Sequence, residues 1–253
     1  MIETVFGVLV LGGALAGALW FSKQQGAWAA AGAQGMGGDH AAMTRWMFQR
    51  TGFQLAALRG APLEAQVEQA MRQAGQPLNE THLVRTTDGF EFHFVQRTAM
   101  TPSGGVSMSA RWSTPAAPPF GLHVADRRLT SVGQAMVNAL TNLSREFTPL
   151  YPNEVGLADP ELAARFRVWS SDPAQAVSYL ARPALRHALL ALPSVDFVLS
   201  PSEISLADPL MENLTGGRPA ASLVGMPVQA IVEAQAQGHD AVARLFAAAL
   251  GRA

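Results

Sequence analysis

The fold is decided by a stretch of alternating apolar and polar side chains, FEFHFVQRT at residues 90–98. Successive side chains of a β-strand point to opposite faces. The three phenylalanines therefore share one face, whereas Glu91 and His93 lie on the other. A period of two with one apolar and one polar face is typical of an antiparallel sheet that has one side in water.

A second alternating run follows at residues 105–113, after a short link rich in turn-forming residues. Such a link between two alternating runs predicts a β-hairpin. A slip of one residue would set phenylalanine against serine, so only even registers match the two apolar faces. We therefore expect Phe92 to lie opposite Trp112, and His93 opposite Arg111.

Further elements are expected on both sides of this hairpin. Apolar or alternating runs predict strands at residues 81–86, 120–126, 165–169, 195–200 and 203–207. Apolar side chains at helical spacing, with capping signals, predict helices at residues 39–58, 62–74, 172–192 and 227–250. Pro183 must kink or restart the third helix, because proline lacks the amide hydrogen that a helix needs. The order predicts an α+β fold, with an antiparallel sheet packed on one face by helices.

The N-terminus carries an uncharged and mostly apolar run, VFGVLVLGGALAGALWF at residues 5–21. As a helix it would be about 25 Å long, near the lower limit for crossing a bilayer. Aromatic residues at its end and Lys23 after it are typical of the membrane interface. We therefore expect one transmembrane helix in contact with the lipid bilayer. A cleaved signal peptide and a buried core helix are the alternatives.

The charges beside this run indicate an orientation. Glu3 precedes it and Lys23, the only lysine, follows it, so the positive-inside rule favours a cytoplasmic C-terminal part. A periplasmic domain is the alternative. The sequence thus predicts a single-pass protein of the bacterial inner membrane with four parts: a transmembrane anchor at 1–23, a Gly/Ala linker at 24–38, juxtamembrane helices at 39–78 and an α+β soluble domain at 79–253.

Composition and motifs exclude several classes of function. The chain has no cysteine, which rules out disulfides, thiolate metal sites and a cysteine nucleophile. Its formal net charge of −1 at pH 7 argues against nucleic acid as a partner. The motifs GxSxG, HExxH and GxGxxG and the Walker phosphate loop are absent. The sequence therefore assigns no catalytic, cofactor-binding or metal-binding residue.

One group of polar side chains is a candidate for chemistry. Glu91, His93, Arg111 and His123 all fall on the polar face of the predicted sheet. Under a covering element they would form an acid–base or metal-binding cluster, and without one they are a solvated face, which is the usual state. Surface or capping roles are expected for the isolated histidines, His82, His187 and His239.

Two functions follow from these observations. The anchor and the missing motifs favour a non-catalytic binding or assembly module, whose partner is another protein or a second copy of the chain. The alternative is a membrane-anchored hydrolase that uses the polar sheet face through Glu91, His93 and His123.

One stretch is similar to a known family. The sequence FRVWSSDPAQAVSYLARPAL at residues 166–185, with the strand pair at 195–207, resembles a family of uncharacterised bacterial membrane-anchored proteins. Their soluble domain carries a similar block, in which an aromatic strand precedes serine, aspartate and Leu-x-x-Pro. The resemblance covers Phe166–Asp208. It implies a membrane-anchored protein and brings no activity, cofactor or site residue.

Overall fold

The computed structural model describes residues 40–74, 80–87, 89–100, 106–127, 149–208 and 228–252. The strands in these ranges are β1 (Gln54–Leu55), β2 (Glu80–Thr87), β3 (Phe90–Met100), β4 (Val106–Pro115), β5 (Leu122–Asp126), β6 (Asn153–Glu154), β7 (Phe166–Ser170), β8 (Asp196–Leu199) and β9 (Glu203–Asp208). The helices are α2 (His40–Thr51), α3 (Leu63–Ala74), α5 (Pro160–Arg165), α6 (Pro173–Leu180), α7 (Pro183–Ala191) and α8 (Val228–Ala249), with a 3-10 turn at Ala56–Leu58.

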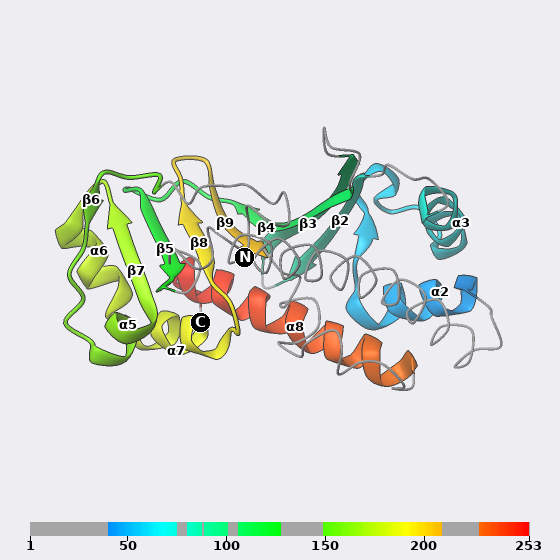
Figure 1. The fold of residues 1–253 in the computed structure, drawn as a ribbon. Helices are drawn as coiled ribbons and strands as arrows, with labels where there is room; N and C mark the ends of the chain where they lie inside the picture. The colour runs from blue at the N-terminus through cyan, green and yellow to red at the C-terminus, as the bar shows by residue number, and fades with distance from the viewer. Residues whose placement is uncertain are drawn as a thin grey trace, which may run out of the picture.

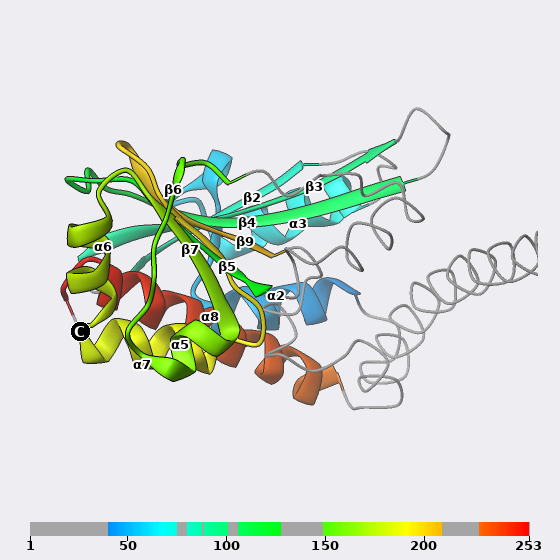
Figure 2. The same cartoon turned by 60° about the vertical axis from the view of Figure 1, so that its left-hand side comes forward.

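All the described strands form one nine-stranded antiparallel sheet in the order β1-β2-β3-β4-β9-β8-β5-β7-β6. Helix α8 packs against α7 and α2, and the three helices lie together on one side of the sheet (Figures 1 and 2). We call the face toward α8 the inner face and the opposite one the outer face. The predicted α+β class, with an antiparallel sheet packed on one face by helices, is confirmed.

The structure corrects the membrane part of the fold prediction. No helix in the described part of the chain is long and apolar enough to cross a bilayer. The 22-residue α8 has the length, but it carries charged side chains at Glu233, Asp240 and Arg244. For these residues, the predictions of a membrane protein and of a single-pass protein are therefore wrong. The predicted span at 5–21 lies outside them, and the bilayer contact and inner-membrane location inferred from it stay predictions.

The hairpin of β3 and β4 has the predicted faces but a different register. Trp112 lies opposite Phe94 rather than Phe92, and His93 lies opposite Ser113. Both predicted pairs are therefore wrong by two positions. Matching an apolar face to an apolar face excludes the odd registers, but every even register satisfies it equally well.

The core lies between the inner face and α8. Trp112, Phe92 and Phe246 of α8 are fully buried. The rings of Phe92 and Trp112 stack with centroids 5.2 Å apart, and Phe246 meets Phe92 edge-on at 5.4 Å. Each buried side chain of this kind contributes roughly 1.5–3 kcal/mol relative to an exposed one. The alternation of residues 90–98 thus serves to place one row of large rings under the helix.

Local signals account for where the helices begin and end. The Asp172 side chain caps α6 by accepting a backbone N–H of its first turn, and Pro183 restarts the chain as a separate helix, α7. The helix predicted at 39–58 ends earlier, at Thr51. The reason is Gly52, whose φ of 70° is left-handed and stops a right-handed helix.

Candidate functional site

The outer face carries one continuous row of side chains across the sheet. Strand pairing sets these residues side by side in the order Val84, His93, Ser113, Ser205, Val198, His123, Trp169. His93 and His123 do share a face and even a row, as the sequence indicates. They are nevertheless four strands apart, and strands are spaced about 4.8 Å, so the two imidazoles are roughly 19 Å from each other. The predicted trio of Glu91, His93 and His123 is not one site.

His123 lies in a covered part of the outer face. Its side chain is 5% exposed, and its Nε2 donates to Oδ1 of Asp196 at 2.8 Å. The backbone N–H of Leu150 donates to its Nδ1 at 3.3 Å, and Tyr151 of the same segment donates to the carbonyl of Leu199. The expectation of a solvated His123 is therefore corrected, because a segment distant in sequence crosses it. With both ring nitrogens bonded, this histidine holds that segment in place.

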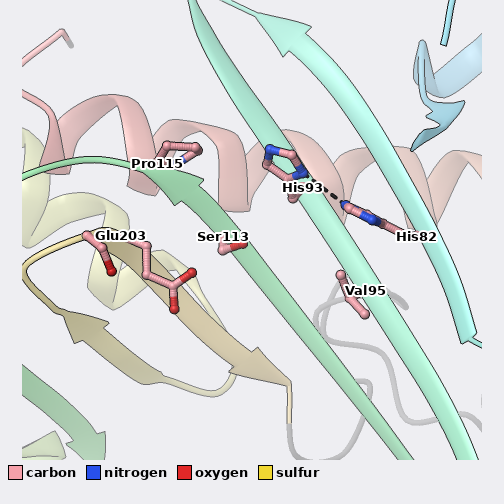
Figure 3. Close-up of a pocket in the computed structure, with 7 residues that line it drawn as sticks. His82, His93, Val95, Ser113, Pro115 and Glu203 are labelled. Carbon is pink, nitrogen blue, oxygen red and sulfur yellow. Dashed lines mark hydrogen bonds between the residues drawn. The ribbon is translucent and has the colours of Figure 1, made fainter. Parts of the chain in front are cut away.

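Glu91 and His93 do meet, and His82, which the sequence predicts to be isolated, joins them. Nε2 of His93 donates to Oε1 of Glu91 at 2.7 Å, and Nδ1 of His93 lies 3.0 Å from Nε2 of His82. A guanidinium nitrogen of Arg59 lies 2.7 Å from the other carboxylate oxygen of Glu91. With the His93 proton on Nε2, its Nδ1 accepts and His82 donates. We call His82 and His93 the imidazole pair (Figure 3).

The charges around the imidazole pair are ordered by its neighbours. The hydrogen bond from Arg59 lowers the pKa of the Glu91 carboxyl below its usual range. Burial, followed by the nearby imidazole of His93, lowers the pKa of His82. At neutral pH the carboxylate is therefore charged and His82 is neutral, so a fixed negative charge orients His93 from behind.

The imidazole pair forms one wall of a shallow hollow of about 270 Å³ on the outer face. The remaining lining residues are Val95, Ser113, Pro115, Ser202 and Glu203. Figure 3 shows these side chains in front of the sheet and α8 behind it. Arg111, a fourth member of the predicted cluster, binds the Glu203 carboxylate and donates to Oγ of Ser205 at 3.0 Å. It therefore does not reach Glu91.

The hollow does not resemble a closed catalytic pocket. Ligand pockets usually have about 300–1,000 Å³ and bury most of the ligand. Among the described residues, no group of three or more histidine, aspartate or glutamate side chains is arranged to hold a metal ion. What the arrangement offers is a set of hydrogen-bonding groups around the hollow: the imidazole pair, a hydroxyl from Ser113 and the Glu203 carboxylate, which Arg111 already binds.

A further histidine, His239 of α8, lies on the inner face, so the surface or capping role expected for it is wrong. It is 6% exposed and lies edge-on to Trp112 and Phe53, with centroids 4.8 Å and 5.1 Å away. Burial lowers its pKa to about 3. Within the described part of the chain its Nδ1 has no hydrogen-bond partner. This imidazole is therefore neutral core packing rather than an acid or a base.

The sequence does contain signals for the positions of His239 and His82, which were not predicted. His239 precedes Val242 and Phe246 by three and seven residues, which is the spacing of one helix face. The sequence Asp88-Gly89 is a two-residue hairpin signal, which predicts that Thr87 pairs with Phe90, and this pair is present in the structure. Counting back along that pairing sets His82 diagonally beside His93.

No protein-family model, curated protein or solved structure matches this chain. The resemblance of Phe166–Asp208 to a family of membrane-anchored proteins therefore stays a prediction.

Proposed function

We propose that this protein is a non-catalytic binding module, and that a protein partner binds its outer sheet face at the hollow beside the imidazole pair. The observation that carries the proposal is the imidazole pair itself, held in one geometry by Glu91 and Arg59 on the face opposite α8. The His93 side chain is 18% exposed. It is accessible to a partner, yet it lies in a partly desolvated place where hydrogen bonds are stronger than in water.

The geometry gives less support to a hydrolase. Hydrolysis needs a nucleophile or activated water, a base within about 3 Å of it and donors for the developing negative charge. Of the three residues suggested for that role, His123 is roughly 19 Å from His93 by strand spacing. A shallow, open hollow also leaves the reacting atoms in bulk water, where electrostatic stabilisation is weak. A complementary protein surface needs neither enclosure nor a nucleophile.

A blocking substitution tests the proposal. Ser113→Arg fills the hollow with a long charged side chain, whereas Ser178→Arg adds the same side chain to an exposed position of α6. We expect wild type and Ser178→Arg to retain one common protein from a lysate of the source cells, or to form the same oligomer in sedimentation velocity. We expect Ser113→Arg to lose it.

His82→Ala serves as a second hollow variant, and unchanged melting temperatures show that each variant is folded. Equal capture and equal oligomeric state for all four proteins would overturn the proposal. The absence of any enriched protein together with a monomeric wild type would overturn it as well.

A further inference from the structure

We propose that the imidazole pair is a binding site for one divalent transition-metal ion, with Nε2 of His82 and Nδ1 of His93 as the two protein ligands. The inference goes beyond the proposed binding function and does not depend on it, because the ion needs no protein partner. It rests on three features of the pair: the spacing of its nitrogens, the carboxylate behind it and the open side toward the hollow.

The spacing of the two nitrogens matches the bite of a metal ion. They are 3.0 Å apart. Zinc–nitrogen bonds are about 2.0–2.1 Å long, so two of them at tetrahedral or right angles hold their nitrogens roughly 2.9–3.4 Å apart. The ring centroids are 5.2 Å apart, so the two nitrogens point almost directly at each other. An ion bonded to both nitrogens lies beside the line that joins them, so each ring turns by roughly 40° as the ion replaces the shared proton. That proton passes through water to Nδ1 of His82, so each ligating nitrogen presents a lone pair.

The carboxylate behind His93 is the usual support of a metal-binding histidine. A ligating imidazole typically donates its other N–H to a carboxylate, which fixes the tautomer and makes the ligand more basic. Glu91 takes that position, 2.7 Å from Nε2 of His93, and Arg59 holds the carboxylate at 2.7 Å from its other side. His82 and His93 stand on adjacent strands, so the sheet fixes their backbones in advance.

The remaining coordination positions face the hollow. Its lining includes the Ser113 hydroxyl and the Glu203 carboxylate, and its volume of about 270 Å³ has room for water ligands. Imidazole nitrogens favour zinc, nickel and copper, whereas calcium and magnesium prefer sites made of oxygen. Two protein ligands without a thiolate make an exchangeable ion rather than a structural one. The ion keeps open positions for water or for a group from a partner.

Isothermal titration calorimetry of the full, untagged chain with Zn²⁺ tests the site. We expect one ion per chain, with affinity reduced at least tenfold in His82→Ala and in His93→Ala. Glu91→Gln keeps both ligands and is expected to weaken binding by roughly 10–100-fold. His187→Ala removes an exposed histidine on α7 and is the matched control, with unchanged affinity.

A second readout locates the ion directly. Imidazole nitrogen resonances report which ring nitrogen is bound, and we expect Zn²⁺ to shift Nδ1 of His93 and Nε2 of His82 while His239 stays unchanged. The proposal is overturned if wild type binds none of Zn²⁺, Ni²⁺ and Cu²⁺. It is equally overturned if both alanine variants, folded by circular dichroism, bind as tightly as wild type.

Discussion

The two faces of one sheet hold histidines under opposite conditions. On the outer face, both ring nitrogens of His93 are bonded to side chains, Glu91 and His82. On the inner face, His239 lies among aromatic rings, and its Nδ1 has no partner within the described residues. The difference comes from α8, which covers only the inner face. The same residue type therefore acts as packing on one side and as a hydrogen-bonding group on the other.

The comparison also separates where stability and function lie. The inner face buries large aromatic rings, whose removal from water is the main favourable term in folding. Around the imidazole pair the outer face holds polar groups joined by largely exposed ion pairs, which contribute little to stability. Substitutions on the inner face should therefore change the free energy of unfolding, whereas those around the imidazole pair should change binding alone.

The largest expected effect comes from Trp112, which is fully buried on the inner face. Trp112→Ala leaves a cavity beneath Phe92 and His239 and should lower the free energy of unfolding by about 3–5 kcal/mol. Ser113→Ala changes the next residue, on the outer face, and should stay within about 0.5 kcal/mol of wild type. Urea denaturation followed by tryptophan fluorescence or circular dichroism measures both. Similar losses in the two variants would contradict the division between the faces.

A smaller, pH-dependent effect is expected at His239. Its pKa is about 3 in the folded chain, against about 6.5 for an unfolded histidine, so the unfolded state binds the extra proton between these values. Stability is therefore unaffected above about pH 6.5 and falls with decreasing pH below it. By pH 5 the loss is about 2 kcal/mol.

His239→Leu removes this titration, so it should lose about 2 kcal/mol less than wild type between pH 7.5 and pH 5. The exposed His187→Leu is the control and should follow wild type. Denaturant midpoints at a series of pH values check the difference. Parallel curves for wild type and His239→Leu would mean that the imidazole is hydrated and not held neutral by burial.

Alternation and capping predicted the local fold because they act over a few residues. The phenylalanines of residues 90–98 face the core as expected, and α6 begins at Asp172 and ends before Pro183 as expected. The register of β3 and β4 could not be predicted, since Trp112 lies on the inner face whether it is opposite Phe92 or Phe94. The order of the strands could not be predicted either, because β4 pairs with β9 across a long stretch of chain and no local pattern encodes that neighbour.

Only part of the candidate site could be predicted, because local patterns do not fix the contacts between distant segments. Glu91 and His93 lie two residues apart on one strand, so their meeting follows from the period of two. The alternation in its own strand also places His123 on the polar face, but a segment containing Leu150 covers it. Only the folded chain brings His123 and that segment together. His82 required the register of β2 and β3, which the Asp88-Gly89 turn signal supplies once it is used.

The smallest expected effect is the coupling of Arg59 with Glu91 on the outer face, where the two side chains are 54% and 33% exposed. A double-mutant cycle with Arg59→Ala and Glu91→Gln should give a coupling energy of about 0.2–1 kcal/mol at pH 7. Because Arg59 lowers the pKa of Glu91, this coupling is present above the unfolded carboxyl pKa and is lost as pH falls below it. A coupling above about 2 kcal/mol would place this pair with buried networks. The outer face would then stabilise the fold as the inner face does, and the rigidity of the imidazole pair would be part of folding rather than a feature kept for binding.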